Sequence, residues 1–145
     1  MKRPITGTLR RTGVVAAAVA TALLASAGVA SAATGSATAS GTGVYGSANW
    51  EWTRSGWKNG NAAVRDTGCD GEPVYVHFRA KKANSTYVYS TVKRFNYNGC
   101  RGDDGYWTGL GFDAGYYITS VQVVACVDTS TPRCYFSAWQ DNPLT

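Results

Sequence analysis

Histidine and carboxylate side chains are the groups in this 145-residue chain that could do acid–base chemistry. His77 is the single histidine, so a general base or a Ser–His–Asp arrangement would depend on it alone. The residues beside it in sequence supply neither a nucleophile nor a group to orient the ring. The sequence therefore predicts a protein that is not an enzyme and that uses no cofactor.

The carboxylates form two groups in glycine-rich segments: Asp66, Asp70 and Glu72, then Asp103 and Asp104. Aspartate in such segments usually makes turns. A disulfide between Cys69 and Cys100 would bring the two groups together, where they could hold calcium or another cation or serve as paired glycosidase carboxylates. Because the ligand spacing of an EF-hand is absent, turn formation is favoured and no metal site is predicted.

Tryptophan is the most unusual feature of the sequence. Trp50 and Trp52 share one face of an expected strand, and Trp57 follows. Such indoles suit the core of a sheet, a platform for sugar rings or a flat protein-binding surface. The core is favoured over either surface role. If the surface role holds, the partner-binding residues are Val44, Tyr45, Trp50, Trp52 and Trp57.

The four cysteines predict a disulfide framework, because an even number of cysteines in an exported chain is normally paired. The absence of a CxxC motif and the single histidine argue against zinc. Three pairings are possible. The favoured one joins Cys69 to Cys100 and Cys126 to Cys134 as two sequence-local loops, although the sequence alone does not fix the pairing.

The N-terminal segment, residues 1–32, has the features of a secretory signal peptide. A basic region ends at Arg11, residues 13–25 are uncharged and apolar, and Ala30-Ser31-Ala32 suits a signal peptidase. The apolar run is shorter than the roughly 20 residues that span a bilayer. We therefore expect a secreted, extracellular protein with no membrane span after signal removal.

The net charge of +5 comes mostly from this segment, which holds four cations and no acid. The remaining chain has ten basic and nine acidic residues, a balance of +1. A nucleic-acid partner is therefore not expected.

The mature chain is expected to be all-β. Residues 73–81 alternate, with Val74, Val76, Phe78 and Ala80 on one face. Six further strands are expected at residues 48–54, 62–66, 86–95, 106–112, 116–127 and 133–139. About seven short strands and two disulfides predict a small antiparallel β-sandwich over residues 44–145.

Residues 33–43 contain only Ala, Ser, Thr and Gly. Because such side chains bury little apolar surface, we expect a flexible arm there, either a spacer or a segment that becomes ordered on a partner.

A family resemblance is carried by Cys126-Val127-Asp128, by Cys134, by residues 137–143 and by Asn98-Gly99-Cys100 ahead of an aromatic strand. Over about residues 66–143 the chain resembles small secreted four-cysteine proteins of filamentous actinobacteria. Some of these are similar to the small subunit of umbrella toxin complexes. The resemblance implies a non-enzymatic adaptor that joins a lectin-like subunit to a large repeat-containing stalk.

The expected function is therefore that of a secreted binding protein, an adaptor whose partners are other secreted proteins. The alternatives are a carbohydrate- or cell-wall-binding module with a polysaccharide partner, or a small antibacterial protein acting alone. A protease inhibitor that presents the loop between Cys126 and Cys134 is a further alternative.

Overall fold

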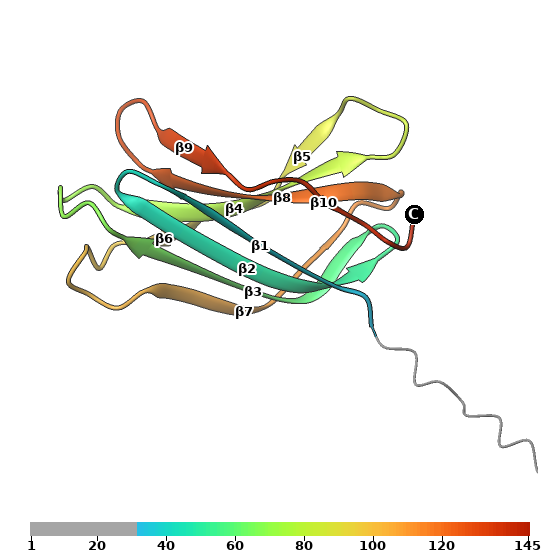
Figure 1. Ribbon diagram of the computed structural model, residues 1–145, viewed down its shortest axis with the longest axis horizontal. Helices are drawn as coiled ribbons and strands as arrows, with labels where there is room; N and C mark the ends of the chain where they lie inside the picture. Colours follow the sequence, from blue (N-terminus) through green and yellow to red (C-terminus); the bar gives the residue numbers. More distant parts are fainter. Residues whose placement is uncertain (1–31) are drawn as a thin grey trace, which may run out of the picture. The chain divides into compact units, whose positions relative to one another are not determined.

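A computed structural model describes residues 32–145, which form an all-β fold of two antiparallel sheets packed face to face (Figure 1). The predicted fold class, an antiparallel β-sandwich with two disulfides, is confirmed. The predicted signal peptide lies outside the described residues, apart from Ala32. Within residues 32–145 no helix has the length and apolar character needed to cross a membrane.

The first sheet has the strand order β1-β2-β3-β7. Its strands are β1 (Thr34–Gly41), β2 (Val44–Thr53), β3 (Gly56–Asp66) and β7 (Gly105–Asp113). The second sheet has the order β10-β8-β4-β5, with β6 also paired to β4 and β9 to β8. Its strands are β4 (Val74–Lys82), β5 (Val88–Ser90), β6 (Arg94–Asn96), β8 (Ile118–Val127), β9 (Arg133–Phe136) and β10 (Gln140–Asp141).

The described residues hold ten strands where the sequence predicted about seven. One predicted strand, residues 86–95, divides into β5 and β6. Arg79 pairs with Ser90, but Val76 pairs with Arg94, so the register changes by one residue in between. A one-residue bulge of this kind is invisible in the alternation of side chains.

Residues 34–41 form strand β1, so the prediction of a flexible arm over residues 33–43 is wrong. β1 pairs with β2 along its whole length without a register shift, and Gly43 at the turn has a φ of +87°. Ala39 is buried in the core, and a Cβ atom on Gly35 would overlap the indole of Trp50. Pairing and close packing therefore order a segment that has no large apolar side chain, and the sandwich begins at β1 rather than at Val44.

The core lies between the sheets. It combines the inward valines of β4 and β8 with large aromatic side chains. Phe78 is at its centre, with ring centroids 5.9 Å from Trp50 and 5.0 Å from Trp57. The inward face of β4 follows the predicted alternation, because Val74, Val76, Phe78 and Ala80 are all buried.

Two disulfides stabilise the edges of the fold. Cys69 is bonded to Cys100 and Cys126 to Cys134, the pairing with sequence-local loops. The first bond joins the loop after β3 to the loop before β7. The second links directly paired positions of β8 and β9.

Candidate functional site

Trp50, Trp52 and Trp57, for which the sequence favoured a core position, lie in the core. Trp50, Trp52 and Trp57 are 2%, 5% and 3% exposed, and Val44 is 1% exposed. The favoured prediction of a core position for the tryptophans is confirmed, and the alternative binding role of these four residues is wrong because their side chains cannot reach a partner or a sugar. Of the five predicted partner-binding residues, only Tyr45 is exposed, on the outward face of β2.

His77 lies on the outward face of β4 and is partly buried. Its Nδ1 atom is buried and has no hydrogen-bond partner among the described residues. Burial is the main cause that lowers the pKa of His77 below 6.5, and the positive charges of Lys93 and Arg79 act in the same direction. The imidazole is therefore neutral at physiological pH and packs 6.0 Å from the Tyr75 ring, measured between centroids.

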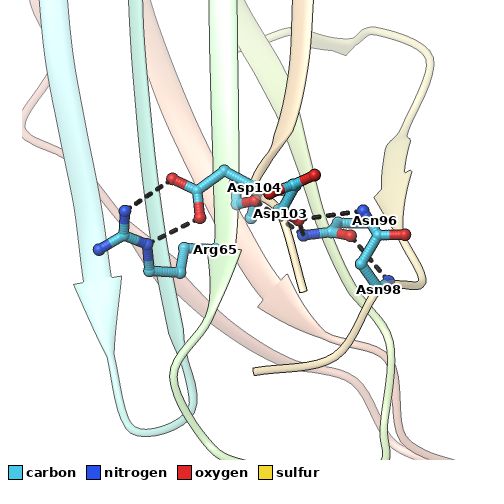
Figure 2. A network of polar contacts seen from close by, with 6 residues as sticks. Arg65, Asn96, Asn98, Asp103 and Asp104 are labelled. Carbon is cyan, nitrogen blue, oxygen red and sulfur yellow. Dashed lines mark hydrogen bonds and ion pairs between the residues drawn. The ribbon is translucent and has the colours of Figure 1, made fainter. Parts of the chain in front are cut away.

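Asp103 and Asp104 of the second acidic group belong to a polar network with Arg65, Asn96 and Asn98 (Figure 2). Cys100 of the Cys69–Cys100 disulfide lines the same hollow as Arg65, Asp103 and Asp104. Arg65 donates two hydrogen bonds to Asp104, from Nε at 2.7 Å and from Nη2 at 2.9 Å, and thereby keeps the pKa of that carboxyl below its ordinary value. The backbone carbonyl of Asp103 accepts hydrogen bonds from the amides of Asn96 and Asn98 at 3.2 and 3.0 Å.

The first group of carboxylates makes turns and one ion pair. Asp66 accepts a hydrogen bond from the Gly68 N–H at 2.8 Å, and Asp70 pairs with Arg133 at 3.5 Å. Residues 32–145 contain no group of three or more His, Cys, Asp or Glu side chains arranged to hold a metal ion. Asp66, Asp70 and Asp104 therefore act in turns or ion pairs.

A site that the sequence did not predict lies on the outward face of the second sheet. Arg79 of β4 points outward, and its guanidinium carbon lies 5.4 Å from the ring centroid of Phe136 and 5.6 Å from that of Trp139. Both aromatic side chains are substantially exposed, at 53% and 36%. We call Arg79, Gln122, Phe136 and Trp139 the Arg79 platform.

Neighbouring side chains hold the guanidinium in place. Arg79 Nη1 donates a hydrogen bond to Gln122 Oε1 at 3.2 Å, and Gln122 Nε2 donates to the Ser137 carbonyl at 2.7 Å. Gln122 is 7% exposed, so this support is itself buried. A guanidinium has five N–H donors, and this is the one hydrogen bond that it makes within residues 32–145. The other donors are available to a ligand.

The surroundings of the Arg79 platform are cationic. Lys81 follows Arg79 on the outward face of β4, and the Lys93 amine lies 4.4 Å from the ring centroid of Tyr75. Among the described residues, none of these three cations forms an ion pair. Asp141 lies on the same side, opposite Ser120, one outward position along β8 from Gln122. The face therefore carries more positive than negative charge.

This arrangement suits recognition of a carboxylate. A guanidinium presents paired N–H donors that match the two oxygens of a carboxylate, and contacts with the two aromatic rings limit its movement. The pairing of β8 with β9 creates the site, because Cys126 opposite Cys134 places Phe136 opposite Val124. The alternation of β4 predicted that Arg79 points outward, and the favoured disulfide pairing brought the segments of β8 and β9 together. The pairing of β4 with β8, which completes the site, could not be read from the sequence.

Comparison with protein-family models, with curated proteins and with solved structures finds no match to this chain.

Proposed function

We propose that this protein is a non-enzymatic binding protein, the adaptor subunit of an extracellular protein complex, and that the Arg79 platform holds an acidic group of one partner. The observation that carries the proposal is the guanidinium of Arg79, which is held by Gln122, keeps unused donors and lies within 5.6 Å of the centroids of two exposed aromatic rings. Arg and Trp are enriched among the few residues that supply most of the binding energy of protein interfaces, and Phe is enriched at interface cores.

An extracellular location is supported by the two disulfides, which form and persist in oxidising compartments. It also agrees with the signal peptide that the sequence predicts. The resemblance to the small subunit of umbrella toxin complexes suggests a lectin-like protein and a large repeat protein as partners.

An adaptor must contact two partners, and the two sheets have outward faces of different chemistry. The second sheet offers the aromatic and cationic Arg79 platform. The first sheet offers short neutral side chains, such as Ser36, Thr38 and Asn49. Trp50 and Trp52 cannot form the alternative polysaccharide-binding surface, because both indoles are buried.

The proposal is tested by a quantitative pull-down of tagged protein secreted by its own host. Arg79→Ala should lose the co-purifying partner that the unchanged protein recovers. Arg101→Ala, which removes the same side chain from an exposed loop, is the matched control and should retain it. Equal recovery by both variants would refute a role for Arg79.

A direct measurement uses a synthetic decapeptide of glutamate, with a glutamine decapeptide as the neutral control. Calorimetry should show binding of the glutamate peptide alone, weakened about tenfold or more by Arg79→Ala, since a lost hot-spot contact costs about 2 kcal/mol. Phe136→Ala should act in the same direction, because it frees one side of the guanidinium. Equal affinity for both peptides would contradict recognition of an acidic group.

A further inference from the structure

The outward face of the first sheet contains a hollow of about 420 Å³. Two rows of paired residues cross it from strand to strand. Ser36, Asn49 and Asn61 form one row, and Thr38, Ser47, Ala63 and Tyr106 form the other. Short side chains in the middle of these rows leave the space, and we call it the polar hollow.

None of the residues that line the polar hollow is charged. The charged side chains of this face lie along the strands on either side and are paired with one another. On one side Glu51 binds Lys58 at 3.9 Å and accepts a hydrogen bond from Asn59 at 3.1 Å. On the other side Arg65 binds Asp104. A ligand in the hollow therefore meets neutral polar groups and no unpaired ion.

The amides of Asn49 and Asn61 are oriented by each other. Asn61 Nδ2 donates a hydrogen bond to Asn49 Oδ1 at 3.0 Å. This bond leaves the Asn49 Nδ2 group as a donor and Asn61 Oδ1 as an acceptor. A donor and an acceptor on directly paired residues of β2 and β3 suit two adjacent hydroxyl groups, each of which both donates and accepts.

Tyr106 supplies an aromatic surface at the β7 side of the hollow. Its side chain is 62% exposed, and its ring packs against no other aromatic ring among the described residues. An exposed ring with an apolar face and a polar tip can stack on the apolar face of a sugar ring. Its phenol remains free to hydrogen-bond.

We propose that the polar hollow is a binding site for a neutral carbohydrate chain. The sugar stacks on Tyr106, and its adjacent hydroxyls bond to the amides of Asn49 and Asn61. Protein interfaces concentrate large aromatic side chains and Arg at their centre, whereas the centre of this hollow has Ala63 and Ser47. A shallow, neutral, hydroxyl- and amide-lined surface matches a sugar better than a protein surface.

The test is a titration of isotope-labelled protein with soluble neutral hexasaccharides, followed by amide NMR shifts. The panel contains β-linked hexamers of glucose, xylose, mannose and N-acetylglucosamine. At least one should shift amides of β1, β2, β3 and β7 around the hollow at millimolar concentration. The affinity for that sugar should fall about tenfold in Tyr106→Ala and in Asn49→Ala, as expected for loss of a main contact.

Two controls separate this site from others. Tyr97→Ala removes another exposed tyrosine, 74% exposed and next to the end of β6, and should leave sugar affinity unchanged. Arg79→Ala should also leave it unchanged, because the inference does not depend on the Arg79 platform. Tyr106→Phe should retain most of the affinity, since the stacking ring remains.

The proposal is overturned if no hexamer shifts these amides, or if Tyr106→Ala binds as tightly as the unchanged protein. A free polysaccharide and the glycan of a partner glycoprotein share the same chemistry. Deglycosylation of a captured partner would abolish binding through the hollow in the second case and have no effect in the first. Loss of partner capture in Arg79→Ala with intact sugar binding would uphold both proposals separately.

Discussion

The side-chain amide of Asn142 donates a hydrogen bond to the backbone carbonyl of Thr53, 89 residues earlier in the chain, at 2.8 Å. The same Nδ2 group donates to the Ile118 carbonyl at 2.9 Å. Thr53 ends β2 of the first sheet, and Ile118 begins β8 of the second. Asn142 is 4% exposed, so this one buried amide connects the two sheets at an end of the sandwich.

Replacing Asn142 with alanine should lower the free energy of unfolding by about 2 kcal/mol or more, because two buried carbonyls lose their donor. Chemical denaturation measures the change. Asn98→Ala is the matched control, since its exposed amide bonds a single carbonyl at 3.0 Å, and it should cost clearly less. Equal losses in the two variants would show that Asn142 does not connect the sheets as described.

Gly35→Val should destabilise the protein by about 1–3 kcal/mol, because any side chain at this position meets the Trp50 indole and the core must shift. The measurement is the melting temperature of each variant. Ser40→Val is the control, since Ser40 is exposed on the outward face of β1. A flexible arm would tolerate both substitutions equally, so identical melting temperatures would contradict the presence of β1.

Removal of the Cys69–Cys100 disulfide should cost more than removal of Cys126–Cys134. The bonded cysteines are 31 residues apart in sequence in the first disulfide and 8 residues apart in the second. In the loop-entropy account, closing these loops contributes about 3.7 and about 2.6 kcal/mol. Double Cys→Ala variants, compared by denaturation, test the order. The opposite order would mean that the packing of Cys126, which is fully buried, outweighs chain entropy.

The stability of the protein should depend on His77 at mildly acidic pH. Its folded pKa lies below the ordinary value of 6.5, so the unfolded chain binds a proton more readily than the folded one. This contribution is fully present above about pH 6.5 and is lost as the pH falls toward the folded pKa.

Denaturation of the unchanged protein and of His77→Gln between about pH 7.5 and pH 5 isolates this effect, because the carboxylates titrate alike in both proteins. The unchanged protein should lose more stability than the variant over this interval. A parallel pH profile would mean that burial does not suppress protonation of His77.

Local side-chain patterns were sufficient for part of this structure. The alternation in residues 73–81 predicted β4 and its inward face, because the side chains of a strand point alternately to its two sides. The even number of cysteines and their short spacings led to the pairing that the structure has. These properties depend on neighbours within a few residues, or on short loops.

The tertiary structure alone decided β1 and the candidate site, and it confirmed the core position of the tryptophans that the sequence favoured. Residues 34–41 have no apolar pattern of their own, and they are ordered by pairing with β2 and by Gly35 packing on Trp50. An alternating face can be inward or outward, and Trp50 became core because the second sheet covers it.

The Arg79 platform depends in the same way on distant segments. It combines one residue of β4, one of β8, one of β9 and Trp139, which become neighbours only when β8 pairs with β4 on one side and β9 on the other. The chain itself determined that its strands are amphipathic and that its cysteines pair. Which side chains meet on the finished surface was decided by long-range strand pairing, whose register no local pattern specifies.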